Sequence, residues 1–154
     1  MEIKELGHLV LFVRDLSTSA HFYRDVLGWR PILDESTQRG SVVAAFNAPG
    51  GRTHHELLLI EVGPSAAVLP TGRRVGMYHF GLKIGTSDDE LRDALEVLRA
   101  NDVALVGATD HGMTHSLYIV DPDGNEIELY VDVPGVDWED PSWFTTSSPR
   151  PLHL

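Results

Sequence analysis

The stretch His8-Leu9-Val10-Leu11-Phe12-Val13 is matched in the second half of the chain by His79-Phe80-Gly81-Leu82-Lys83-Ile84. Both stretches have the apolar character of strands, and each begins with a histidine. A helical pattern follows each stretch, and further strand-like runs come after it. The sequence therefore predicts two related β-α-β-β-β modules with a histidine at the same place in both.

The first module is predicted over about residues 5–62. Its first strand covers residues 6–13, and its helix follows Ser17 as N-cap and ends before Gly28 as the C′ residue. Turn residues at 47–51 separate the last two of the three remaining strands, which are expected at 29–33, 41–46 and 55–62.

A linker at 63–76 leads to the second module, at about 77–131. Its strand at 79–84 is followed by a helix that Ser87 or Asp88 can cap. The apolar stripe of this helix consists of Leu91, Ala94, Leu95 and Leu98. Three strands are expected at 103–106, 116–120 and 126–131, with a hairpin turn at 121–125.

The tail, residues 132–154, contains too many prolines for a long helix. Its aromatic residues Trp138, Trp143 and Phe144 suggest packing on the same domain or on a partner subunit, and a loosely ordered tail is the alternative. The predicted fold is α+β: a single domain over residues 1–154, in which two βαβββ modules form a curved mixed sheet with a concave metal-binding cleft.

The amino-acid composition excludes several classes of function. The formal net charge of −11 argues against nucleic acid or an anionic membrane as partner, because both need clustered positive charge. The chain has no cysteine, which excludes thiolate metal sites and cysteine nucleophiles. No signal peptide or membrane-spanning run is present in the sequence, so a cytoplasmic protein is expected. The chemistry is left to eight histidines and the carboxylates.

The repeated histidines, His8 and His79, suggest a metal held between the two modules, with Glu128 as the third ligand. Glu128 shares one face of its strand with Glu126 and Tyr130, while apolar residues occupy the other face. Two imidazoles and one carboxylate leave coordination positions open and suit Fe(II), while Mn(II), Zn(II) and Ni(II) are compatible with the same ligands.

Four motifs give the chain a family resemblance. The motifs are HLVLFVRDL at 8–16, FYRDVLG at 22–28, YHF at 78–80 and DPDGNEIEL at 121–129. The last motif includes the predicted ligand Glu128. They resemble the vicinal oxygen chelate superfamily, which includes glyoxalases, bleomycin resistance proteins and extradiol dioxygenases. The resemblance covers most of the chain, from about residue 6 to residue 131. It implies paired βαβββ modules and a divalent metal that chelates vicinal oxygens of a substrate.

The reaction depends on two neighbouring residues in the first module, His55 and Glu56. Glyoxalase-type members carry a glutamate as a fourth ligand here, which would be Glu56, whereas extradiol enzymes carry a second-sphere histidine, which would be His55. Neighbours in a strand point to opposite faces, so only one of the two is expected to face the metal.

Two further residues favour the dioxygenase interpretation. Tyr118 lies ten residues before Glu128, where the extradiol family has an active-site tyrosine, and His111 resembles another second-sphere histidine of that family. His115 is the alternative for part of the role of His111. The residues expected to line the substrate site include Phe12, Phe46, Met77 and Met113.

The leading hypothesis is an Fe(II)-dependent extradiol dioxygenase that cleaves a catechol-like aromatic with O₂. His8, His79 and Glu128 would hold the metal, and His55, Tyr118 and His111 would be catalytic. A glyoxalase- or epimerase-like enzyme with Glu56 as fourth ligand is one alternative, and a non-catalytic drug-binding protein is another. Members with a single pair of modules often dimerise, so the resemblance implies a homodimer.

Overall fold

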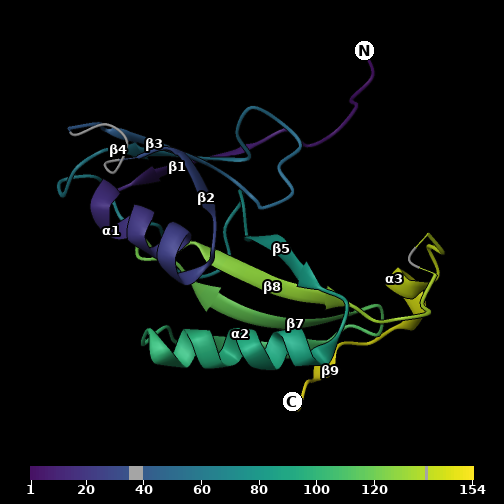
Figure 1. Cartoon of the computed structure of the whole chain (residues 1–154). Coiled ribbons are helices and arrows are strands. Elements are labelled where there is room, and N and C mark those ends of the chain that lie inside the picture. Colours follow the sequence, from purple (N-terminus) through teal and green to yellow (C-terminus); the bar gives the residue numbers. More distant parts are fainter. Residues whose placement is uncertain (35–39, 138) are drawn as a thin grey trace. The chain divides into compact units, whose positions relative to one another are not determined.

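The computed structural model describes residues 1–34, 40–137 and 139–154. It divides into two compact units, Met1–Leu69 and Pro70–Leu154, and each contains one of the predicted modules (Figure 1). Within the described residues, the strands are hydrogen-bonded as two mixed sheets, one in each unit. The predicted α+β class and the repeated βαβββ order are confirmed.

The first unit is a four-stranded sheet with a helix against one face. Its strands are β1 (Leu9–Val13), β2 (Arg30–Leu33), β3 (Val43–Asn47) and β4 (Leu57–Glu61), arranged in the order β1-β4-β3-β2. Strand β1 is parallel to β4, and the other pairs are antiparallel. Helix α1 (Leu16–His21) continues as the π-helical segment η1 (Phe22–Val26).

Alternation along the strands decides which side chains form the core of the first unit. In β1, Leu11 and Val13 are buried while Val10 and Phe12 are exposed. Leu57 and Leu59 of β4 are buried together with Leu16, Ala20 and Tyr23 of the helical segment. The apolar positions of both elements therefore meet in one core.

The second unit repeats this arrangement and extends it by one strand. Its strands are β5 (His79–Gly85), β6 (Leu105–Asp110), β7 (Thr114–Val120), β8 (Glu126–Asp132) and β9 (Arg150–Pro151), in the order β5-β8-β7-β6-β9. Strand β5 is parallel to β8. Helix α2 (Asp88–Ala100) runs along the sheet (Figure 1), and Leu91 and Leu98 of its predicted stripe are buried.

Local hydrogen bonds explain where the two helices begin. Asp15, rather than the predicted Ser17, is the N-cap of α1, because its side chain accepts a hydrogen bond from the Thr18 amide at 2.7 Å. Ser87 is the N-cap of α2, as expected, and the Glu90 carboxylate accepts from the Ser87 amide at 3.0 Å. Gly28 has a φ of +76°, which fits its predicted place just after the first helix.

The predicted strands begin or end at somewhat different residues in the structure, and three of these differences bear on the site. Strand β1 begins at Leu9 rather than at residue 6, and β6 begins at Leu105 and runs on to Asp110. Strand β4 begins at Leu57, so His55 and Glu56 precede it. Strict alternation therefore does not apply to these two residues.

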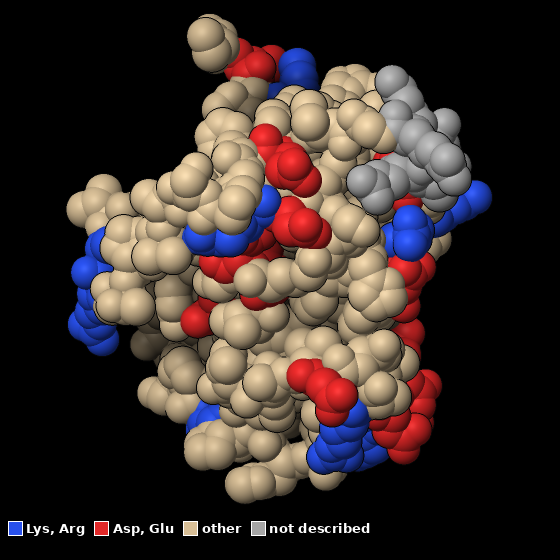
Figure 2. All heavy atoms as spheres, turned by 90° about the vertical axis from the view of Figure 1, so that its left-hand side faces the viewer, with Lys and Arg blue, Asp and Glu red and all other residues tan. Residues whose placement is uncertain are grey.

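The tail packs on the second unit in its described part. It forms a short helix, α3 (Trp143–Thr146), and then β9, which pairs with β6. The expected packing of Trp138 lies outside the described residues. No helix among the described residues is long and apolar enough to span a bilayer. On the face drawn in Figure 2, basic side chains are interspersed with acidic ones and form no broad basic surface.

Candidate functional site

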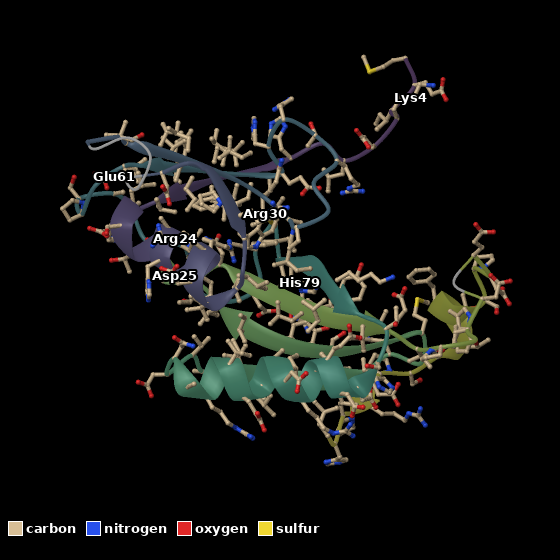
Figure 3. The ribbon with its side chains drawn as sticks, viewed as in Figure 1. Lys4, Arg24, Asp25, Arg30, Glu61 and His79 are labelled. Atoms are coloured by element: carbon tan, nitrogen blue, oxygen red, sulfur yellow. The ribbon has the colours of Figure 1, made fainter. Side chains whose placement is uncertain are left out.

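In the second unit, the structure brings together the predicted ligands His79 and Glu128. His79 begins β5 (Figure 3), and Glu128 lies in the middle of the neighbouring parallel strand β8. The Nε2 atom of His79 is 3.3 Å from Oε2 of Glu128, and Nδ1 is 3.4 Å from Oε1 of Glu126. His79 therefore lies between two carboxylates, and both of its ring nitrogens face an acidic group.

A hydrogen-bond chain continues from the other oxygen of Glu128. The Tyr118 hydroxyl donates to Oε1 of Glu128 at 3.0 Å, and the Nε2 atom of His111 lies 2.8 Å from the same hydroxyl. The rings of His79 and Tyr118 are 5.5 Å apart in an edge-on arrangement. Four predicted site residues thus lie in one group in this unit.

The environment of Tyr118 keeps its hydroxyl protonated. Burial raises the pKa of the phenol well above its ordinary value, and the negative charge of Glu128 and the hydrogen bond to it raise it further. Tyr118 is therefore a hydrogen-bond donor at neutral pH. A substrate oxyanion beside it would compete with Oε1 of Glu128 for this single O–H.

The first unit holds the other predicted site residues, His8 and His55. Their ring centroids are 4.6 Å apart, and His54 lies beside them with its Nδ1 atom 2.6 Å from Nδ1 of His55. Burial lowers the pKa of His55, and neighbouring His54 and His8 lower it further. Its Nε2 atom is buried and makes no hydrogen bond with the described residues.

The sheet register shows which residue of the first unit corresponds to Glu128. Leu9 pairs with Leu57 in the first unit, and Phe80 pairs with Ile127 in the second. Leu57 of the first unit therefore corresponds to Ile127 of the second. One residue earlier, Glu56 corresponds to Glu126, and one residue later, Leu58 corresponds to Glu128.

Glu56 is also occupied by contacts of its own. Its carboxylate accepts a hydrogen bond from the Ala48 amide at 2.9 Å and one from the Arg52 side chain at 3.2 Å. The position equivalent to the ligand Glu128 carries a leucine in the first unit. Both observations count against Glu56 as a fourth metal ligand.

A family comparison agrees with the repeated fold. The family model of the Glyoxalase/Bleomycin resistance protein/Dioxygenase superfamily matches residues 5–129. The chain belongs to this superfamily. The predicted resemblance is confirmed, but the superfamily joins several activities and does not by itself select the reaction.

Two relatives in this superfamily are dioxygenases. The chain is 36% identical over 138 residues to a catechol-2,3-dioxygenase of Bacillus subtilis (strain 168). The match covers 90% of this chain and 45% of that protein. The chain is 32% identical over 129 residues to biphenyl-2,3-diol 1,2-dioxygenase 3 of Rhodococcus globerulus, covering 82% and 63%. The chain thus spans about half to two thirds of the length of these relatives.

A solved structure supports the superfamily fold. A glyoxylase/bleomycin resistance protein/dioxygenase domain from Frankia sp. EAN1pec matches with a TM-score of 0.71 at 23% sequence identity. The match covers 88% of this chain and 96% of that one.

The His79–Glu128 pair fits a divalent metal of the kind that the superfamily implies. Two ligands at right angles on a metal, each about 2.1 Å from it, lie about 3 Å apart, close to the observed 3.3 Å. Glu126 faces Nδ1 at 3.4 Å without forming a hydrogen bond in this structure, and it lies where a carboxylate commonly orients a metal-bound histidine. Among the described residues, no group of three His, Asp or Glu side chains forms a metal site, so the full set with His8 stays a prediction.

A cavity of about 470 Å³ adjoins Glu128 in the second unit, a size suited to a small organic molecule. Met113, which was expected to line the substrate site, is part of its wall, and so is Phe144 of the tail. Lys83 and Asp132, which form an ion pair, contribute the charged part of the wall. Phe46, also expected to line the site, is instead fully buried in the core of the first unit.

Two residues near the site have neighbours that the sequence did not predict. His115, the alternative for part of the role of His111, has its ring 2.6 Å from Asp88 and 3.7 Å from Asp110. Glu126, which the sequence analysis did not place in the site, faces His79. Its place two residues before Glu128, on the same strand face, was the available signal.

Proposed function

We propose that this superfamily member is a metal-dependent extradiol dioxygenase that cleaves the ring of a catechol-like aromatic. The observation that carries the proposal is the series of side-chain contacts in the second unit that runs from His79 through Glu128 and Tyr118 to His111. The proximity of His55 to His8 in the first unit supports it. His8, His79 and Glu128 are the proposed ligands, and His55, Tyr118 and His111 the proposed catalytic residues.

Fe(II) is the proposed metal, and when bound it would supply Lewis acidity and open positions for the two catechol oxygens and O₂. Tyr118, held as a neutral phenol, would turn its single O–H from Oε1 of Glu128 to a substrate oxygen and so orient the ring. His111 would fix the direction of that hydroxyl from its other side.

His55 would move the proton. Its Nε2 atom makes no hydrogen bond with the described residues, and the lowered pKa keeps the ring neutral at physiological pH. A neutral imidazole can take a proton from a catechol hydroxyl and return it later in the reaction.

Glyoxalase-type chemistry has less support in the first unit. A fourth carboxylate ligand would be needed there, but Glu56 is held by Ala48 and Arg52, and Leu58 takes the position equivalent to Glu128. A purely drug-binding protein would have no need for the His79–Glu128 pair and its hydrogen-bond chain.

The proposal includes a small aromatic substrate, O₂ as co-substrate and a homodimeric assembly. The homodimer rests on the resemblance to superfamily members with a single pair of modules, which often dimerise. Light scattering of the purified chain tests the dimer separately from the chemistry.

The reaction is tested by loading the protein with Fe(II) without oxygen and then adding O₂ with a panel of substituted catechols. We expect oxygen uptake and a ring-opened product that contains both atoms of the added O₂, as labelling with ¹⁸O₂ would show. Hemithioacetals of glutathione with 2-oxoaldehydes serve as the competing panel for glyoxalase-type chemistry. An iron-loaded protein that binds none of the catechols and consumes no O₂ contradicts the proposal.

A further inference from the structure

The catalytic candidate His111 lies in a turn rather than in a strand. It follows β6 and precedes β7, and its amide donates to the Thr114 carbonyl at 2.9 Å. The sheet ladder pairs Asp110 with His115 but does not extend into the turn. The direction of the His111 ring is therefore set by the contacts of residues 110–114.

The C-terminal segment provides several of those contacts. Arg150 of β9 pairs with Asp110 of β6, and its Nη2 atom donates to Oδ2 of Asp110 at 2.8 Å. The other oxygen of Asp110 accepts from the Gly112 amide at 2.7 Å, inside the turn. Asp110 thus connects the end of the chain to the residue that follows His111.

The remaining contacts of the turn also come from the segment after β8. The Val133 amide donates to the Met113 carbonyl at 2.9 Å. Gly112 adopts a φ of +85°, and a Cβ atom there would lie 3.3 Å from the Trp143 ring and 3.1 Å from the Ser147 hydroxyl. Trp143 itself donates to the Asp137 carbonyl at 3.0 Å, so the segment is folded back on itself where it meets the turn.

We propose that Arg150 is a positioning residue for His111: it holds Asp110, and with it the turn that directs His111 at the Tyr118 hydroxyl. The contribution of His111 to catalysis rests on the proposed function, whereas the connection from Arg150 to the turn does not. Strand β9, more than 30 residues beyond the turn, in this way acts on the proposed catalytic residue His111.

The Arg150 side chain is 70% exposed, so its ion pair is weak by itself and screened by salt. Much of the effect must come from the backbone pairing of β9, in which the Leu152 amide donates to the Ala108 carbonyl. We therefore expect a graded response: a small effect for Arg150→Ala, a smaller one for Arg150→Lys, and the largest for a chain that ends at Ser148.

The first test needs neither metal nor substrate. Hydrogen exchange of the His111 amide, followed by NMR in the metal-free protein, should be about threefold faster in Arg150→Ala and about tenfold faster in the shortened chain. Arg99→Ala, which changes an exposed arginine on α2, is the matched control and should leave this rate unchanged. Wild-type protection of the His111 amide in the shortened chain would overturn the proposal.

The second test uses the Fe(II)-loaded protein. Because His111 hydrogen-bonds to Tyr118 at 2.8 Å and lies farther, at 3.7 Å, from the proposed ligand Glu128, we expect kcat for catechol to fall about threefold in Arg150→Ala and about tenfold in the shortened chain. Fe(II) affinity should stay within about twofold of wild type, and Arg150→Lys should recover most of kcat. Equal losses of metal affinity and kcat would reduce Arg150 to a merely structural role and overturn the inference. If no catechol is turned over, the proposed function fails, and the exchange rates still decide whether Arg150 holds the turn.

Discussion

At the level of single residues, the two oxygens of Glu128 have different neighbours. Oε2 faces His79 and Oε1 accepts the Tyr118 hydroxyl. Tyr118→Phe removes only that donor, so Fe(II) binding should persist. We expect kcat/KM for catechol to fall about 10- to 100-fold, as for the loss of a charge-assisted hydrogen bond of about 1.5–3 kcal/mol. Oxygen-uptake kinetics and Fe(II) titration measure the two effects.

Tyr130→Phe is the matched control for this prediction. It removes a hydroxyl from the wall of the cavity that adjoins Glu128, on the same strand as Glu128. We expect its kcat/KM to remain within about threefold of wild type. Equal rates for Tyr118→Phe and wild type would remove Tyr118 from the proposed mechanism.

The neighbours His55 and Glu56 give a second prediction at this scale. His55→Ala should leave Fe(II) binding within about threefold of wild type and lower kcat for catechol by about 10²-fold or more, the usual contribution of a proton-transfer residue. Glu56→Gln should change neither quantity by more than a few-fold, because the Glu56 carboxylate contacts Ala48 and Arg52. If Glu56→Gln abolishes metal binding and His55→Ala spares activity, the glyoxalase-type alternative is the better one.

At the scale of elements, one ion pair fixes the helical segment of the first unit to the end of β2. The Nη1 atom of Arg24, in η1, donates to the fully buried carboxylate of Asp34 at 2.7 Å. The other end of the guanidinium contacts Asp25, which lies beside it in Figure 3. Arg24→Ala leaves the buried carboxylate of Asp34 without this partner, and we expect a loss of about 2–3 kcal/mol in the free energy of unfolding.

Urea unfolding measures this change, with Arg92→Ala as the control. Arg92 makes a comparable contact with Asp89 at 2.6 Å, but both side chains are largely exposed, so we expect less than about 1 kcal/mol. Similar losses for the two variants would show that burial of Asp34 does not determine the strength of its ion pair.

The contact of Arg24 with Asp25 predicts a dependence of stability on pH. The hydrogen bond from Arg24 lowers the pKa of Asp25 from 3.8 to about 2 in the folded chain. A carboxylate with a lowered pKa stabilises the fold above its unfolded pKa, and this contribution is lost as the pH falls through the folded value. Wild type should therefore lose stability between about pH 4 and pH 2 more steeply than Arg24→Ala, as thermal unfolding across that range would show.

The elements themselves were largely predictable, because apolar alternation and cap residues are local signals. The apolar stripe of α2 and its cap at Ser87 are confirmed. The N-cap of the first helix is Asp15 instead of the predicted Ser17, because either Asp or Ser can cap a helix and the sequence pattern does not choose between them. Strand β9 contains Pro151 and pairs with a strand 40 residues earlier, and no local pattern indicates such a contact.

The site was predictable to a smaller extent. The strand face shared by Glu126, Glu128 and Tyr130 followed from a period of two, and the proximity of His79 followed from the repeat. The register of the strands, which decides which residues of neighbouring strands pair, did not follow from the alternation or from the repeat. The pairing of Leu9 with Leu57 is needed to see that Leu58, and not Glu56, corresponds to Glu128.

At the scale of the whole molecule, the proposed metal requires both units at once. His8 belongs to the first unit, whereas His79 and Glu128 belong to the second. A metal bound by all three should stabilise the folded chain as one system, by about 2.7 kcal/mol when the free metal is 100-fold above Kd. For a chain of this size, that corresponds to a rise in Tm of several degrees, on the order of 5–10 °C.

Thermal unfolding with and without Fe(II) or Mn(II), under anaerobic conditions, measures this rise. His8→Ala and His79→Ala should each remove most of it, because two remaining ligands bind a divalent metal far more weakly than three. His153→Ala, which changes a histidine near the end of the tail, should keep the full rise. A His8→Ala protein with the wild-type rise in Tm would place the metal in the second unit alone. The repeated histidines would then not share one ion, and the proposed function would have to be rebuilt on His79 and Glu128.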